Sequence, residues 1–254
     1  KRIGDEHLKA LGAYGITEDT LLESVKRNYD LNRFLNLLFN GQELVECDPP
    51  SQPMLQDVWL GHPNMQMMAA RDQEGSGEGL FLAAWGGHNA QSHNHNDVGN
   101  FVIFADGKPI VIDIGRPTYR RQTFSNRRYE IWAFQSGFHN LPTINGVDQK
   151  AGRQFAAKNV SYHKNGSSAQ IEMDITEAYP KAAGTESWNR IVRFNRRKDV
   201  VVVDSYTLKK PSKDIIENFV VAGKVTDTEP GKLILNDREE EVQVLLEYDS
   251  AKLS

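Results

Sequence analysis

The sequence predicts a mainly β protein, a large antiparallel β-sandwich of two or more stacked sheets, preceded by a short helical segment. Three observations support this. The first forty residues carry apolar side chains at helical spacing, short apolar runs separated by Gly, Asn, Asp and Pro begin near residue 54, and two runs meet at a two-residue turn. We expect the helical segment over residues 1–50 and the sandwich over 51–254, because 254 residues suffice for one large domain or two small ones.

The helical segment contains two predicted helices. Thr20 and Glu23 have the spacing of a capping box, in which both side chains satisfy backbone N–H groups at a helix start. A second helix is predicted to begin at Asp30 and to end at the Asn-Gly pair 40–41. Two short helices cannot bury their apolar faces alone, so we expect the end of a larger helical domain or a collar on the sandwich.

About twelve strands are expected in the remainder, which is typical of a sandwich. The predicted strands are residues 55–60, 65–70, 79–85, 100–105, 110–114, 155–163, 169–175, 190–194, 200–206, 216–221, 233–235 and 242–248.

The hairpin over residues 100–115 is the most sharply defined element. Asp106-Gly107 favours a type I′ turn, and a two-residue loop fixes the register. The predicted pairs are Ala105 with Lys108, Ile103 with Ile110, Phe101 with Ile112, and Asn100 with Asp113. Both strands are otherwise apolar, so Asp113 is predicted to be a buried carboxylate that needs a partner.

Composition excludes several classes of protein. The 30 basic and 34 acidic residues give a net charge of −4, which argues against a dedicated nucleic-acid binder. The longest apolar runs, 101–105 and 200–203, are far shorter than the roughly 18 to 20 residues of a membrane span. The single cysteine, Cys47, cannot form an intramolecular disulfide. Because the chain starts at Lys1 without a leader, we expect a piece of a longer protein.

Histidines gather in one part of the sequence. His93 and His95 lie in a Gly/Asn-rich segment together with His88, whose role stays open, and the predicted hairpin returns Asp113 close to His95. Two imidazoles and a carboxylate suit Zn²⁺ and leave a fourth position for another ligand. The alternative is a surface loop in which backbone amides cap Asp113. Asp97 is either a further ligand or, as we favour, an Asx-turn residue.

Two metalloenzyme patterns match only in part. The spacing of His93, His95 and Asp97 resembles the metallo-β-lactamase motif, but Val98 stands where that motif has a second histidine. The segment from Gly87 to His95 resembles the first cupin motif but lacks its glutamate. Each match fails at a metal ligand.

A third resemblance extends further along the chain. The stretch from Ser92 to Gly115, followed by Thr118-Tyr119, an Arg/Tyr/Trp segment, His139-Asn140 and Ile144-Asn145-Gly146, resembles the heparinase II/III family of polysaccharide lyases. The similarity is densest over residues 80–149. The helical start resembles the end of that family's α/α toroid, and the remainder resembles its C-terminal β-sandwich.

The resemblance implies roles for individual residues. His95, Asp113 and His139 match the family's structural zinc site, and His93 matches an active-site histidine facing the substrate. Such lyases cleave uronate-containing polysaccharides by β-elimination, in which a base removes the C5 proton and an acid protonates the departing O4. Tyr119 and Tyr129 are the neighbouring phenols that could act as acid or substrate ligand, or simply pack.

Local charge favours an anionic glycan. Five guanidinium groups follow the hairpin: Arg116, Arg120, Arg121, Arg127 and Arg128. Guanidinium groups pair with carboxylate or sulfate, so this segment is a candidate polysaccharide-binding surface, although each arginine could instead pair with Glu130 or another acid. Trp85 and Trp132 are candidates for stacking on sugars or for the core.

The resemblance also implies partners. The polysaccharide would be heparin-like, heparan sulfate-like or alginate-like, and the protein periplasmic or secreted. From the composition, neither nucleic acid nor a membrane is expected as a partner. The missing toroid would supply the other half of the cleft, so we expect this chain alone to fold but to be inactive or nearly so. The alternatives are a non-catalytic glycan-binding sandwich and a cupin-like or lactamase-like metalloenzyme.

Overall fold

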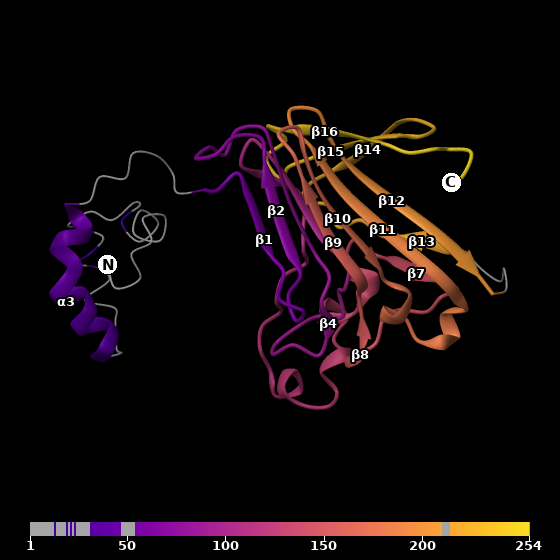
Figure 1. Ribbon diagram of the computed structural model, residues 1–254, viewed down its shortest axis with the longest axis horizontal. Helices are drawn as coiled ribbons and strands as arrows, with labels where there is room; N and C mark the ends of the chain where they lie inside the picture. The colour runs from indigo at the N-terminus through magenta and orange to yellow at the C-terminus, as the bar shows by residue number, and fades with distance from the viewer. Residues whose placement is uncertain are drawn as a thin grey trace. The chain divides into compact units, whose positions relative to one another are not determined.

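The structure, a computed structural model, describes residues 13, 19, 21, 23, 31–46, 54–209 and 214–253 (Figure 1). Thr20 of the predicted capping box lies outside these residues, as do Asp30 and Cys47. The chain divides into two compact units, one comprising Lys1–Leu55 with Glu74–Ser76 and the other Gln56–Gln73 with Gly77–Ser254. No helix in the described part is long and apolar enough to cross a membrane.

The first unit contains helix α3 (Leu31–Val45). The prediction that the Asn-Gly pair ends this helix is wrong, because the helix continues past it. Asn40 donates its amide to the carbonyl of Asn36 one turn earlier, at 2.8 Å. Gly41 is buried, and a Cβ there would lie 2.7 Å from Cδ2 of Leu21. Glycine at this position therefore allows close packing and does not stop the helix.

The second unit is built mainly of antiparallel strands. One sheet has the order β1-β2-β3-β5-β6, with β1 (Asp57–Leu60), β2 (Met67–Arg71), β3 (Leu80–Trp85), β5 (Phe101–Ala105) and β6 (Lys108–Val111). A second has the order β12-β11-β10-β9, with β9 (Lys158–Lys164), β10 (Ser168–Asp174), β11 (Thr185–Asn195) and β12 (Asp199–Leu208).

Smaller sheets and short 3-10 helices complete this unit. The smaller sheets pair β4 (His88–Asn89) with β8 (Gly152–Ala156), β7 (Pro142–Ile144) with β13 (Ile215–Glu217), and β15 (Lys232–Asn236) with both β14 (Val225–Glu229) and β16 (Gln243–Glu247). The 3-10 helices are η1 (Arg121–Phe124), η2 (Arg128–Glu130), η3 (Trp132–Phe134), η4 (Ser136–Phe138), η5 (Thr176–Ala178) and η6 (Lys181–Ala183).

The core lies between the two large sheets, which face each other in Figure 1. Alternation along the strands provides it: Met68 and Ala70 of β2 are buried, as are Ile171 and Met173 of β10. On β11 the buried row is Trp188, Arg190, Val192 and Phe194. The predicted mainly β, antiparallel sandwich is therefore confirmed, with one arginine inside the apolar row.

Several strand boundaries differ from the predictions. The predicted strand 155–163 is two strands, because the N–H of Ala157 turns away to donate to the carbonyl of Gly87 at 2.9 Å. The predicted strand 216–221 is confined to β13 (Ile215–Glu217). The sequence analysis missed β4, β7 and β14, of which the first two are too short to show a period of two.

The hairpin turn is confirmed, but the predicted register is wrong beyond its first pair. Asp106 and Gly107 have φ of 48° and 74°, as a type I′ turn requires, and Ala105 pairs with Lys108. Ile103 then pairs with Val111 instead of Ile110, because β6 accommodates an extra residue as a bulge after Pro109, which has no N–H to donate.

The predicted pair of Phe101 with Ile112 is also absent from the pairing of β5 with β6. The N–H of Ile112 donates instead to the carbonyl of Val220 at 2.8 Å. The chain therefore leaves β5 just before Asp113 and contacts a different segment.

Candidate functional site

Three loops bring His95, Asp113 and His139 together. One ligand atom from each residue lies within 4.8 Å of the other two, and the two imidazole centroids are 5.1 Å apart. His95 lies in the turn-rich loop before β5, Asp113 follows β6, and His139 follows η4. The structure thus brings together all three residues that the sequence analysis selected as metal ligands.

His139 has the features of a ligand. Its side chain is fully buried, and neither ring nitrogen has a hydrogen-bond partner among the described residues. Its Nδ1 lies 3.0 Å from Oδ2 of Asp113, which is an ion-pair distance. Buried polar atoms without partners are costly, and a cation among the three side chains would satisfy them. Two histidines and one carboxylate therefore fit a Zn²⁺ ion.

The protonation states also suit a cation. Burial, followed by the proximity of His139, lowers the pKa of His95 to about 4, so its imidazole is neutral near pH 7. Burial by itself would raise the pKa of Asp113, but His139 and the N–H of Gly115 lower it on balance. Neutral imidazole and ionised carboxylate are the forms that bind metal.

Asp113 is held by two donors. Asn100 donates its amide to Oδ2 at 3.1 Å, and the backbone N–H of Gly115 donates to Oδ1 at 2.7 Å. One backbone amide thus caps this carboxylate, and His139 approaches the oxygen that Asn100 holds. The predicted proximity of Asn100 and Asp113 is therefore observed as a side-chain hydrogen bond, without the predicted strand pairing.

Asp97 is neither of the two things predicted for it. Among the described residues, Asp97 is not part of the group that could hold a cation together with His95. Its Oδ2 accepts from the indole N–H of Trp85 at 3.1 Å, and burial raises its pKa to about 6. The N–H of Gly99, which an Asx turn would direct to Asp97, donates to the carbonyl of Trp85. Asp97 therefore fixes Trp85 to the loop.

His88 has an ordinary structural environment. Its Nε2 lies 3.2 Å from Oδ1 of Asn64, and its Nδ1 accepts from the N–H of Ala90 at 3.1 Å. Burial, followed by Arg153, lowers its pKa. Both nitrogens are occupied, so His88 holds the loop around β4.

His93 is exposed and lies apart from the metal cluster. Its ring centroid is 6.3 Å from that of Tyr119 and 6.2 Å from that of Phe124. Its φ of 61° is in the left-handed region, which directs the chain so that His93 reaches the surface while His95 reaches the cluster. Arg128 holds this conformation by donating to the carbonyl of His93 at 3.0 Å.

The two candidate tyrosines differ in environment. Tyr119 is 41% exposed, and the guanidinium of Arg116 lies 5.1 Å from its ring centroid. Tyr129 donates its hydroxyl to Oδ1 of Asn94 at 2.9 Å, and burial raises its pKa. Tyr119 therefore shares the exposed surface of His93, whereas Tyr129 supports the loop.

The five arginines also divide. Arg116, Arg120 and Arg121 are exposed. Arg127 forms an ion pair with Glu130 at 2.7 Å. Arg128 donates to loop carbonyls, and its guanidinium lies 3.9 Å from the ring centroid of Phe134. The first three are thus available to an anion, while the last two already have internal partners.

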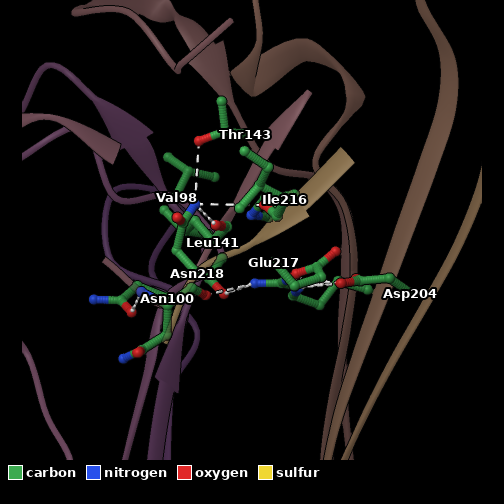
Figure 2. A network of polar contacts seen from close by, with 12 residues as sticks. Val98, Asn100, Leu141, Thr143, Asp204, Ile216, Glu217 and Asn218 are labelled. Carbon is green, nitrogen blue, oxygen red and sulfur yellow. Dashed lines mark hydrogen bonds and ion pairs between the residues drawn. The ribbon is translucent and has the colours of Figure 1, made fainter. Parts of the chain in front are cut away.

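The sequence analysis missed the residues that support the cluster. Asn140, directly after His139, is buried and binds three separate segments through its side chain. Arg190, Asp204 and Glu217 extend the polar network into the sandwich (Figure 2). A signal was present for one of them, because Arg190 interrupts the inward apolar row of its strand.

The chain is thus a β-sandwich protein with a candidate metal centre of two histidines and one aspartate. The sequence places the chain more narrowly: residues 80–250 match the family described as heparinase II/III-like, C-terminal, and the chain belongs to this family. The resemblance seen in the motifs is thereby confirmed.

Solved structures show the same fold. A mutant of the heparan sulfate lyase HepC from Pedobacter heparinus matches with a TM-score of 0.59 and 12% identity, covering 92% of this chain and 33% of that one. A heparinase III matches with a TM-score of 0.58 and 16% identity, covering 84% and 32%. This chain thus spans about a third of the length of these proteins. No curated protein matches its sequence.

Proposed function

We propose that the chain is the C-terminal part of a polysaccharide lyase that cleaves a uronate-containing polysaccharide, heparan sulfate-like or alginate-like, by β-elimination. The observation that carries this is the exposed group formed by His93, Tyr119 and Arg116. His93 lies two residues before His95 of the buried cluster. Membership of the heparinase II/III-like family supports it.

The exposed group supplies what β-elimination needs from this side of a cleft. The substrate carboxylate must be neutralised to acidify the C5 proton, which a base removes while an acid protonates the departing O4. Arg116 pairs with the carboxylate or with sulfate, and Arg120 and Arg121 extend the cationic surface. His93 contacts the carboxylate or takes the proton, and the hydroxyl of Tyr119 donates to the substrate.

The metal has a structural role in this proposal. His95, Asp113 and His139 hold Zn²⁺, which would supply a rigid junction between three loops. His93 is two residues from a ligand, so fixing His95 also fixes the backbone from which His93 projects.

A helical toroid domain supplies the opposite side of the cleft in this proposal, and the protein acts in the periplasm or outside the cell, where it meets its polysaccharide. The isolated chain binds substrate weakly and turns it over slowly or not at all, because the reacting sugar lacks half of its contacts.

The test compares the natural full-length protein with its His93→Ala variant and with the isolated chain. Ultraviolet absorbance of unsaturated uronides, released from heparan sulfate and from alginate, reports the reaction. We expect activity in the full-length protein alone, reduced at least a hundredfold by His93→Ala. Binding without product formation would favour the non-catalytic glycan-binding alternative. Redox-active iron or two bound metals would favour a cupin-like or lactamase-like enzyme.

A further inference from the structure

Arg190 is a charged residue in the apolar core. It lies on β11 between the inward-facing Trp188 and Val192, and only 1% of its side chain is exposed. A buried guanidinium is costly unless its donors are paired. Asp204, opposite it on β12, accepts from its Nε at 2.9 Å and from its Nη2. Glu217 accepts from Nη2 at 3.3 Å.

The remaining nitrogen of the guanidinium group, Nη1, donates to the loops that carry the candidate metal ligands. Nη1 of Arg190 donates to the carbonyl of Asn140 at 2.8 Å and to that of Gly99 at 3.2 Å. Asn140 directly follows His139, and Gly99 lies in the loop that carries His95. One guanidinium group therefore contacts both histidine-bearing segments.

Asn140 continues the network towards Asp113. Its amide donates to the carbonyls of Phe101 at 2.7 Å and Ile112 at 3.0 Å, and its Oδ1 accepts from the N–H of Val220 at 2.7 Å. The N–H of Asn140 donates to Oδ1 of Asn100 at 3.0 Å, and Asn100 in turn donates to Asp113.

Figure 2 shows this network extending from Asp204, past Glu217, to Asn100. Its two ends therefore lie in the sandwich sheet and beside the metal cluster.

We infer that Arg190 and Asn140 are positioning residues, which set the spacing of His95, Asp113 and His139 before an ion binds. This inference rests on the metal site of the proposed function. An apolar side chain in the row of β11 would avoid the cost of desolvation, and such replacements of buried ion pairs are often neutral or stabilising. It could not donate to the carbonyls of Gly99 and Asn140, which is the feature particular to Arg190.

The experiment compares Arg190→Lys and Asn140→Leu with a variant at a matched buried ion pair elsewhere. Arg196 provides the control, because its side chain is 8% exposed and pairs with Asp57 at 2.6 Å, away from the ligand loops. Zn²⁺ affinity is measured by chelator competition, and the Co²⁺-loaded chain gives a spectrum that reports ligand geometry.

We expect Arg190→Lys and Asn140→Leu to weaken Zn²⁺ binding at least tenfold and to alter the Co²⁺ spectrum, whereas Arg196→Lys loses stability with its zinc affinity unchanged. Equal affinities in all folded variants would overturn the inference. Amide hydrogen exchange of the metal-free chains decides the matter even if no zinc binds. Exchange over residues 95–100 and 139–141 should accelerate in Arg190→Lys but not in Arg196→Lys. Unchanged exchange in Arg190→Lys would by itself overturn the inference.

A cavity beside the same loops carries a second inference. It has a volume of about 380 Å³ and is lined by Asn96, Tyr129, Gln135, Asp148, Gln149 and Lys150. Hydrogen bonds fix its walls: Gln135 donates to the carbonyl of Tyr129 at 3.0 Å, and Gln149 donates to that of Val98 at 2.8 Å. Asn96 is 3% exposed, and its Oδ1 has no partner among the described residues.

The lining indicates a neutral polar ligand. Lys150 and Asp148 balance in charge, and the unpartnered Oδ1 of Asn96 can accept a hydrogen bond from a hydroxyl or an amide N–H. The amide of Gln149 is used within the loops, because its oxygen accepts from Asn89 and from the N–H of Val98. The volume is at the small end of ligand sites. Trp132, 51% exposed on the same run of 3-10 helices, offers a flat aromatic face. We propose that this cavity takes the neutral, hydroxylated or N-acylated sugar next to the uronate, a proposal that rests on the proposed function.

Binding measurements with two probes test the cavity. The probes are an unsulfated hexasaccharide of alternating glucuronate and N-acetylglucosamine, and a neutral N-acetylglucosamine tetramer. Gln135→Leu should weaken both five- to tenfold at low and at high salt, because neutral contacts are not screened. The control Lys158→Met, at an exposed lysine paired with Glu177, should change neither.

Each failure has its own signature. Wild-type binding of the hexasaccharide that Gln135→Leu leaves within twofold would overturn the cavity assignment but spare the proposed function. A wild-type chain that binds the neutral tetramer alone would support the cavity and count against the uronate substrate. Failure to bind either probe would overturn the cavity assignment.

Discussion

Nδ1 of His139 lies 3.0 Å from Oδ2 of Asp113, and that oxygen also accepts from the amide of Asn100. One carboxylate oxygen is thus held by an amide and approached by a fully buried imidazole. An ion arriving between Asp113 and His139 would find its ligands already placed, so most of the ordering cost is met by the fold.

The first prediction concerns metal content. The purified chain should bind one Zn²⁺, and His139→Ala should abolish this while an exposed control, His163→Ala, retains it. Zinc at about a hundred times its Kd should stabilise the fold by about 2.7 kcal/mol, since the unfolded chain lacks the site. Elemental analysis and thermal unfolding with and without a chelator measure both effects. Two metals per chain would contradict the assignment.

The second prediction concerns pH. Burial, with Asp204 adding to it and Arg190 opposing it, raises the pKa of Glu217, so the folded protein keeps this proton to a higher pH than the unfolded chain. The resulting stability is complete below the ordinary glutamate pKa of about 4.3 and is lost as the pH rises through the raised value.

The unfolding free energy of the wild type should therefore fall more steeply between about pH 5 and 8 than that of Glu217→Gln, by at most about 1.4 kcal/mol per pH unit. Urea unfolding at a series of pH values measures the difference. Parallel pH profiles for the two proteins would refute this coupling.

The third prediction concerns the core between the large sheets. Ile171 of β10 is fully buried, and Ile171→Ala should cost about 2–5 kcal/mol through lost burial and the cavity left behind. Val203 of β12 is 40% exposed, so Val203→Ala should cost well under half as much. Urea unfolding with unchanged m-values would verify this, whereas equal losses would show that Ile171 is not a core residue.

The fourth prediction separates backbone strain from packing at glycine. Gly99 has φ of 92°, and a Cβ there would lie 3.2 Å from Cγ2 of Ile175. Gly146 has φ of 74° with nothing within 4 Å of such a Cβ. Gly146→Ala should therefore cost about 1 kcal/mol, the strain of the left-handed region.

Gly99→Ala should cost more than that, and it should also weaken zinc binding, because its carbonyl is the group that Arg190 holds. Unfolding free energies and zinc affinities of the two variants provide the comparison. If Gly146→Ala lowers the unfolding free energy and the zinc affinity as much as Gly99→Ala does, packing around Gly99 does not contribute to either.

Local pattern was sufficient for the features that depend on neighbouring residues. Short apolar runs separated by Gly, Asn, Asp and Pro predicted a sandwich, because such runs are typical of strands and those residues of the turns between them. Asp106-Gly107 predicted its turn, because both positions need positive φ. A carboxylate at Asp113 in an apolar hairpin indicated a buried partner. His139 was recognised only through family resemblance, since its distance along the chain gives no geometric information.

Only the tertiary structure decided what depends on distant contacts. Leu21 packs against Gly41 and explains why α3 continues there, and Val220 takes the N–H of Ile112 that the hairpin was expected to use. Arg190 interrupts the apolar row of its strand, and only the tertiary structure shows that it pairs with Asp204 and with the carbonyl of Asn140. Short-range spacing determines where a side chain points, but the groups that meet it are set by how separate segments pack, which no local pattern records.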